Sequence, residues 1–101
     1  PDPNFKPDQA GAARGQAIYD AHCRNCHGVN ATAGGWAPDL RASPIPQSQE
    51  TFSAVIHDGS LVPNGMPRFE EFTDHEREDL RQYIRTKGDE FAKSYRAGAT
   101  Q

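Results

Sequence analysis

Apolar residues recur at helical spacing in three stretches of the chain, and the first stretch lies near its beginning. Four of them fall near helical spacing: Ala13, Ala17, Ile18 and Ala21. This spacing predicts a helix over residues 11–25 with one apolar face. Gly15 lies inside that helix, where glycine is less favourable than alanine. Either another backbone approaches the helix closely at Gly15, which is the usual reason for such a glycine, or the first turn of the helix is frayed.

The second helical stretch runs from Ser48 to Gly59. Ser48 is a good N-cap residue, and Glu50 suits the positive end of a helix. Gly59 is a typical C-terminal stop. The apolar stripe of this helix consists of Phe52, Val55 and Ile56.

The third helical stretch begins with the capping-box sequence Thr73-Asp74-His75-Glu76. Gly88 is its predicted stop. Three apolar residues are expected to face inward: Leu80, Tyr83 and Ile84. On another face arginine recurs every four residues: Arg77, Arg81 and Arg85. Such a row is typical of a solvated helix surface, and a surface that docks a partner is the alternative.

The remaining segments are polar or rich in proline and glycine. Residues 1–10 carry three prolines and predict an extended arm or linker. Residues 28–47 and 60–72 predict irregular loops, the second with a turn at Asn64-Gly65. The sequence therefore indicates an all-α domain over residues 11–88, followed by a polar, loosely held tail over residues 89–101.

Large apolar residues are scarce in this chain. Ile, Leu, Val and Phe make up only 15 of the 101 residues, a fraction usually associated with disorder. Disorder normally also requires a high net charge, and here the net charge is only −3. A large apolar group other than protein, buried in the middle of the domain, would resolve the conflict.

The charge balance and hydropathy exclude two classes of partner. Eleven Lys and Arg residues against fourteen Asp and Glu give no basic excess for nucleic acid. No apolar run approaches the length that crosses a membrane. The sequence starts at Pro1 without a methionine, so we expect that a leader or a longer chain has been removed.

Residues 23–27 carry the candidate chemistry. Cys23-Arg24-Asn25-Cys26-His27 has the pattern C-x-x-C-H, which is a covalent attachment site for haem. Two intervening residues allow both thiols to reach the two vinyl groups of one haem and form thioethers. The next residue, His27, is then placed to ligate the iron.

The two cysteines also fit three other interpretations. A structural zinc site needs four ligands, so two further histidines would have to join the cysteines. A thioredoxin-like dithiol belongs beside a βαβ pattern, and long buried strands are missing from the sequence. A simple disulfide needs only an oxidising compartment.

A second axial ligand must come from elsewhere in the chain. Met66 is the only methionine and lies between Gly65 and Pro67, which favour a fixed irregular loop. A lone methionine often fills a core, but methionine is also a known ligand of haem iron. The rival ligands are three histidines: His22, too near the attachment motif to cross the ring, and His57 and His75, predicted to face solvent from helices.

Taken together these motifs resemble the class I cytochromes c over about residues 11–88. The resemblance rests on Gly15 and Tyr19, on C-x-x-C-H, on Ala37-Pro38-Asp39-Leu40, on Gly65-Met66-Pro67, and on Leu80 and Tyr83. It implies a class I cytochrome c fold whose first and last helices cross near Gly15. It also implies that the Pro38 carbonyl accepts a hydrogen bond from His27. The family usually has glycine before that proline, and this chain has Ala37.

A closer resemblance is to the C-terminal haem c domain of quinohaemoprotein alcohol dehydrogenases. It is carried by the run from Gly34 to Arg41, by Gly59-Ser60-Leu61 and by Gly65-Met66-Pro67-Arg68-Phe69. Those enzymes join a pyrroloquinoline-quinone (PQQ) β-propeller to such a domain through a linker. The resemblance implies that Arg41, and also Trp36, contacts a haem propionate. The alternatives are a surface arginine and a core tryptophan.

The expected function is single-electron transfer through a His/Met-ligated haem c. The expected partner is a PQQ catalytic domain or another redox protein, and the chain alone should be a non-enzymatic monomer. Two alternatives remain: a free-standing soluble cytochrome c, and a haem protein with an open ligand-binding site. Because the family acquires haem outside the cytoplasm, the resemblance implies a periplasmic or exported setting.

Overall fold

The computed structural model describes residues 4–28, 31 and 40–99, with side chains except at residue 42 and residues 95–99. Within these ranges every regular element is a helix, which confirms the predicted all-α fold. The α-helices are α1 (Gln9–His22), α2 (Arg24–His27), α3 (Gln49–Ile56) and α4 (Asp74–Ala99). Three short 3₁₀ helices lie between them: η2 (Leu40–Ala42), η3 (Ile45–Gln47) and η4 (Val62–Asn64).

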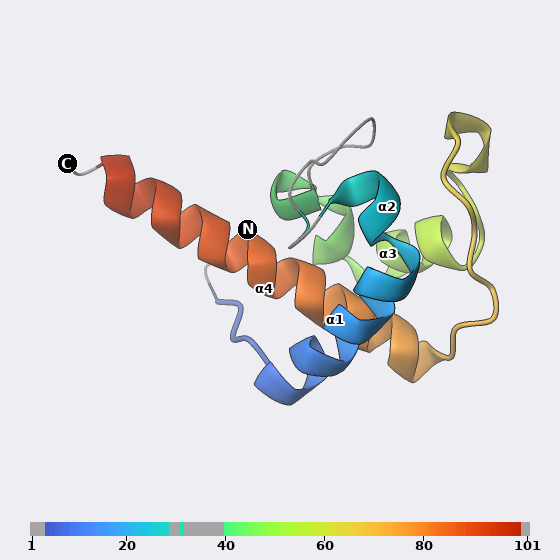
Figure 1. Cartoon of the computed structure of the whole chain (residues 1–101), viewed down its shortest axis with the longest axis horizontal. Coiled ribbons are helices and arrows are strands. Elements are labelled where there is room, and N and C mark those ends of the chain that lie inside the picture. Colours follow the sequence, from blue (N-terminus) through green and yellow to red (C-terminus); the bar gives the residue numbers. More distant parts are fainter. Residues whose placement is uncertain (1–3, 29–30, 32–39, 100–101) are drawn as a thin grey trace.

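Helices α1 and α4 cross each other and form the frame of the domain (Figure 1). At the crossing, a Cβ atom on Gly15 would lie 1.9 Å from the backbone carbonyl oxygen of Asp79. The predicted close backbone approach at Gly15 is therefore confirmed. One turn further on, the rings of Tyr19 and Tyr83 pack with their centroids 5.2 Å apart.

The apolar face predicted for the first helix is wrong for its three alanines, although Ile18 is partly buried against the core. Ala13, Ala17 and Ala21 are exposed, whereas Ala12, Gly15 and Tyr19 are buried. Close contact between α1 and α4 requires small residues on the buried face of α1, so glycine and alanine occupy part of that face. Because alanine also occurs on the exposed face, its periodicity does not reveal which face is buried. The predicted helix over 11–25 is also broken, because α1 ends at His22 and α2 begins at Arg24.

Helix α3 forms as its sequence signals predict, but it is shorter. The Ser48 side chain accepts a hydrogen bond from the Thr51 N–H at 3.2 Å, so Ser48 is the N-cap. Phe52, Val55 and Ile56 are buried in the core. The helix ends at Ile56, three residues before the predicted stop at Gly59.

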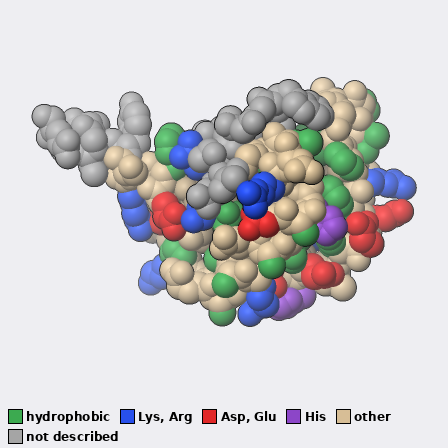
Figure 2. Space-filling model, in the orientation of Figure 1, with side chains coloured by type: hydrophobic (Ala, Val, Ile, Leu, Met, Phe, Trp, Pro, Cys, Tyr) green, Lys and Arg blue, Asp and Glu red, His purple; other side chains and the backbone are tan. Residues whose placement is uncertain are grey.

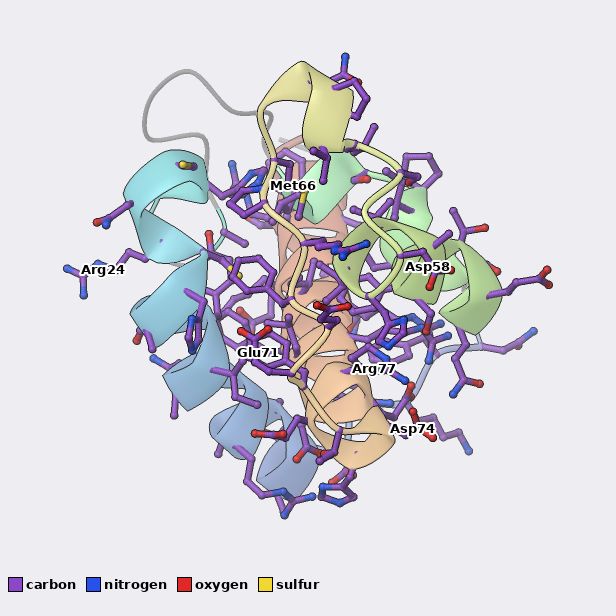
Figure 3. The ribbon with its side chains drawn as sticks, turned by 90° about the vertical axis from the view of Figure 1, so that its right-hand side faces the viewer. Arg24, Asp58, Met66, Glu71, Asp74 and Arg77 are labelled. Atoms are coloured by element: carbon purple, nitrogen blue, oxygen red, sulfur yellow. The ribbon has the colours of Figure 1, made fainter. Side chains whose placement is uncertain are left out.

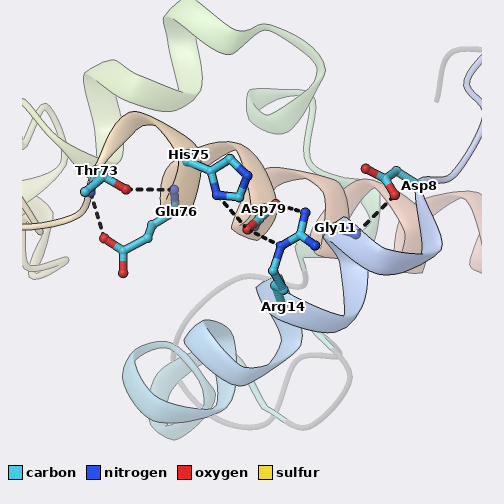
Figure 4. A network of polar contacts seen from close by, with 7 residues as sticks. All are labelled: Asp8, Gly11, Arg14, Thr73, His75, Glu76 and Asp79. Carbon is cyan, nitrogen blue, oxygen red and sulfur yellow. Dashed lines mark hydrogen bonds and ion pairs between the residues drawn. The ribbon is translucent and has the colours of Figure 1, made fainter.

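The N-terminus of α4 confirms the predicted capping box. The Thr73 hydroxyl accepts from the Glu76 N–H at 3.1 Å, and the Glu76 carboxylate accepts from the Thr73 N–H at 2.9 Å (Figure 4). The apolar face is buried as expected: Leu80, Tyr83 and Ile84 are all at most 3% exposed. Burial of a large apolar side chain stabilises the fold by about 1.5–3 kcal/mol.

The predicted helix stop at Gly88 is wrong, because α4 continues to Ala99. A Cβ on Gly88 would lie 2.8 Å from the backbone carbonyl oxygen of Arg41. This glycine therefore serves close packing inside the helix and does not terminate it. The segment predicted as a loose tail is helical up to Ala99.

The arginines of α4 are not a solvated row. The Arg77 and Arg81 side chains are only 14% and 12% exposed. Arg77 donates to the Phe72 carbonyl at 2.9 Å, and Arg81 donates to the Pro46 carbonyl at 2.8 Å. Arg85 lies over the ring of Phe5 at 4.2 Å. They tie the loops and the N-terminal arm to α4, a role that their periodicity does not reveal.

A buried carboxylate links α1 to α4 beside the crossing. The Asp79 side chain, 8% exposed, accepts from Arg14 at 2.9 Å and lies 3.2 Å from His75 (Figure 4). Hydrogen bonding to Asp79 raises the pKa of Arg14. Nearby, Asp8 caps α1 by accepting from the Gly11 N–H at 3.1 Å (Figure 4).

The outer surface mixes charges of both signs. In Figure 2, basic and acidic side chains alternate over the visible face without a broad patch of one sign. No helix in the described ranges has the length and apolar character needed to cross a membrane.

Candidate functional site

The two cysteines and His27 share one turn of helix. Cys23 is the N-cap of α2, and the N–H groups of Cys26 and His27 donate to its carbonyl at 3.2 and 3.0 Å. Residues three and four positions apart lie on the same face of a helix. The local hydrogen bonding therefore presents both sulfur atoms and the imidazole on one side of α2.

The end of α2 is fixed by a partly buried hydrogen bond to α1. The Tyr19 hydroxyl donates to the Gly28 carbonyl at 2.6 Å, and the Tyr19 side chain is fully buried. Gly28 has a φ of 85°, a backbone conformation that favours glycine. The chain thus turns sharply immediately after His27.

A cavity of about 340 Å³ opens beside α2 in the middle of the domain. Cys23, Cys26, His27 and Met66 all line it. Most of the remaining wall is apolar and comes from α3, α4 and the loops, including Leu40, Ile45, Val55, Leu61, Leu80 and Ile84. The fold therefore gathers the residues proposed for attachment and ligation around one apolar space.

Met66 is carried by the loop between α3 and α4. Figure 3 shows it in front of α4, between the helical turn of α2 on one side and α3 on the other. Gly65, with a φ of 96°, makes the predicted turn, and the Met66 N–H donates to the Leu61 carbonyl at 3.2 Å. The loop is tied to α3 by a 2.6 Å hydrogen bond from the Phe69 N–H to the Ile56 carbonyl.

The other candidate site residues lie in different places. Trp36 and Pro38 fall outside the described residues. Arg41 has its guanidinium over the ring of Phe91, 4.1 Å from the centroid. Among the rival ligands, His22 lines the cavity from the last turn of α1. His75 and His57 have side chains that are 73% and 44% exposed.

Sequence comparison identifies the family of this arrangement. The sequence model of a family described as "Cytochrome C oxidase, cbb3-type, subunit III" matches residues 10–84. The chain belongs to this cytochrome c family. The match implies a covalent haem c and so favours haem attachment over the zinc, dithiol and disulfide interpretations. The cofactor is a covalently bound haem c with its iron, and the function is electron transfer.

The cytochrome c domain is similar to segments of larger enzymes. It is 38% identical over 84 residues to the dehydrogenase subunit of alcohol dehydrogenase (quinone) from Gluconobacter oxydans. It is 36% identical over 83 residues to quinohemoprotein alcohol dehydrogenase ADH-IIG from Pseudomonas putida. These regions are 82% and 81% of this chain but only 11% of each relative. The resemblance to the haem domain of quinohaemoprotein alcohol dehydrogenases is confirmed.

A smaller relative is also similar. Cytochrome c550 of Pseudomonas aeruginosa is 32% identical over 65 residues, which are 61% of this chain and 45% of that protein. The shared region of all three relatives thus corresponds to a cytochrome c domain, whether it stands in a dehydrogenase or in a cytochrome.

The cavity suits haem in both its chemistry and its polarity. Burial raises the pKa of the Cys23 thiol to about 12, with a further contribution from Cys26. A neutral thiol is a poor metal ligand, because the thiolate is the form that binds metals, but a thioether carries no charge and suits an apolar wall. When bound, haem iron supplies a one-electron change between its ferric and ferrous states. The apolar side chains exclude water and favour the ferrous state, which carries less charge.

The sequence analysis did not identify the apolar loop residues that complete the cavity. Leu40, Ile45 and Leu61 are isolated in segments rich in glycine, proline and polar residues. No periodicity singles them out. Two signals were available: Leu40 and Leu61 belong to the motifs quoted for the family resemblance, and Ile45 lies between Pro44 and Pro46.

Proposed function

We propose that His27 and Met66 are the axial ligands of the haem iron. The haem of this domain then exchanges single electrons with a redox partner. The observation that supports this most directly is that both residues line the apolar cavity that Cys23 and Cys26 also line. Imidazole and thioether ligation fills both axial positions and favours the ferrous state. With both positions filled, the chain alone has no site for a substrate and is not an enzyme.

The second part of the proposal is that the domain is the electron-accepting part of a PQQ-dependent dehydrogenase. Its support is the similarity to segments of quinone- and quinohaemoprotein-type alcohol dehydrogenases over more than four fifths of the chain. The net charge is only −3, and charges of both signs are interspersed on the face that Figure 2 shows. Strong long-range electrostatic steering toward a separate partner is therefore not expected. Tethering to a catalytic domain makes such steering unnecessary, because it keeps the local concentration of haem high.

Electrons enter most directly through the rim formed by residues 59–67. This rim carries no charged residue, although a quarter of the chain is charged. Val62 at its tip is 49% exposed, and Leu61 and Met66 on the same rim line the cavity. The thioether edge, in contrast, presents the exposed charge of Arg24. Since tunnelling falls steeply with distance, an uncharged rim that a partner can approach without desolvating charges is the favoured route.

A free electron carrier is the second candidate function. The similarity to cytochrome c550 favours it, because that relative is named as a cytochrome and not as a dehydrogenase. Both candidates imply a periplasmic or exported setting, since haem attachment to C-x-x-C-H takes place outside the cytoplasm in this family.

A kinetic experiment separates the two functions. Ferric holoprotein is mixed in a stopped-flow instrument with a PQQ-dependent alcohol dehydrogenase already loaded with alcohol, and haem reduction is followed by absorbance. The holoprotein alone should oxidise no alcohol, yet the loaded enzyme should reduce it rapidly. Reduction no faster than that of an unrelated c-type cytochrome would contradict the dehydrogenase assignment and leave the free carrier.

Two variants test the route of entry in the same experiment. Val62→Asp places a charge on the rim without touching the cavity wall, and it should slow reduction at least severalfold. Arg24→Glu, the matched change at the thioether edge, should leave the rate unchanged. The opposite pattern would overturn the rim as the docking edge while leaving the dehydrogenase assignment intact.

A further inference from the structure

Two residues on the same face of α4 both meet Arg41. Gly88 and Phe91 are three positions apart, which places them one above the other on the helix. At Gly88 the Arg41 backbone comes so close that a Cβ would lie 2.8 Å from its carbonyl oxygen. At Phe91 the Arg41 guanidinium lies 4.1 Å from the ring centroid. One turn of α4 thus holds both the backbone and the side chain of Arg41.

Arg41 belongs to a segment that forms one wall of the haem cavity. Its neighbour Leu40 and, shortly after it, Ser43 and Ile45 all line the cavity. Helix α4 also contributes Leu80 and Ile84 to the same cavity, about three and two turns before Phe91. The extension of α4 beyond Gly88 is therefore attached to the cavity wall through Arg41.

We infer that Phe91 is a positioning residue that fixes Arg41, and through Arg41 sets the reduction potential of the haem. Stacking uses the face of the guanidinium and sets its plane, while the N–H donors lie in that plane at its edge. A carboxylate such as a haem propionate is bound by those edge donors. The inference rests on haem binding by this domain and does not depend on the assignment to a dehydrogenase.

The direction of the effect follows from charge and from water. Arginine remains protonated at all ordinary pH values, so its fixed charge, next in the chain to the wall residue Leu40, favours ferrous over ferric iron. A wall held against α4 also keeps water away from the haem, and water stabilises the more highly charged ferric state. Release of Arg41 weakens both effects, so the reduction potential falls.

The test is redox potentiometry of the holoprotein carrying substitutions at Phe91 and Arg41. Phe91→Ala and Arg41→Gln should each lower the midpoint potential measurably. Phe91→Tyr, which keeps an aromatic face, should retain the wild-type potential. The double variant should match Arg41→Gln alone, because Phe91 acts through Arg41. Ser94→Ala, an exposed change on the same helical extension, is the control and should leave the potential unchanged.

Three results would overturn the inference. They are an unchanged potential in Phe91→Ala, an additive fall in the double variant, and a fall in Phe91→Tyr equal to that of Phe91→Ala. If Phe91→Ala does not yield holoprotein, Phe91→Leu replaces it, because leucine keeps the apolar contact and removes the aromatic face. Thermal unfolding is measured alongside, since a purely structural role would lower stability and leave the potential where it is.

Discussion

The carbonyl oxygen of Asp79 occupies the space that a side chain on residue 15 would need. A Cβ there would lie 1.9 Å from this oxygen and 2.6 Å from its carbon, and both atoms are helix backbone that cannot turn aside. The first and last helices therefore cross at a distance that only glycine permits. This crossing positions Tyr19, and Tyr19 in turn holds the carbonyl of Gly28 immediately after the turn that carries Cys23, Cys26 and His27.

Substitution of Gly15 by alanine should push α1 and α4 apart. Overpacking of this kind lowers the free energy of unfolding by about 2–3 kcal/mol, the upper part of its usual range. Urea unfolding of the holoprotein measures this decrease in the free energy of unfolding. Gln16→Ala, at the exposed neighbouring position, should change stability by no more than about 0.5 kcal/mol. Equal effects of the two changes would contradict the tight crossing.

Covalent attachment of haem through Cys23 and Cys26 is tested by extraction. Denatured protein should keep its colour through acid–acetone treatment, and the intact mass should show one added haem. Cys26→Ala should retain a single thioether, visible as a red shift of the ferrous absorption band. Loss of all colour from the wild-type protein on extraction would refute the thioether assignment.

Ligation of iron by Met66 has a spectroscopic signature. The ferric protein should show a sulfur-to-iron charge-transfer band in the far red. Met66→Ala should abolish this band, lower the reduction potential and allow carbon monoxide or cyanide to bind. His57→Ala and His75→Ala should leave the band intact, because both side chains are substantially exposed. A band that survives in Met66→Ala would point to another ligand.

Two buried tyrosines should make the protein sensitive to alkali. Burial raises the pKa of both Tyr19 and Tyr83 above the ordinary value of 10.0. The folded protein therefore keeps both phenols neutral at pH values where the unfolded chain ionises. Their contribution to stability is complete below about pH 10 and is lost as the pH rises further, by up to about 1.4 kcal/mol per pH unit for each tyrosine.

The measurement is urea unfolding at several pH values, in the wild-type protein and in Tyr19→Phe. Phenylalanine removes one ionising group, so the stability of the variant should fall less steeply above about pH 10. Its stability at neutral pH should be lower, because the hydrogen bond to Gly28 is lost. Parallel pH profiles would contradict the prediction.

Local chemistry was readable from the sequence because it depends on residues that are close together in the chain. The spacing of Cys23, Cys26 and His27 predicts an attachment turn for haem, and the helix caps at Ser48 and Thr73 form through local hydrogen bonds. The turn at Gly65 and the all-α class follow from similarly short patterns. Family membership also followed, since these motifs appear in a characteristic order.

Features that depend on contacts between distant segments were decided only by the tertiary structure. Gly88 has the sequence signature of a helix end, yet the helix continues because the Arg41 backbone approaches it from a segment more than forty residues away. Arg77 and Arg81 have the periodicity of a solvated face, yet loop carbonyls bind them and remove them from water. A residue's own spacing determines which helix face it occupies, but what packs against that face determines whether it is buried.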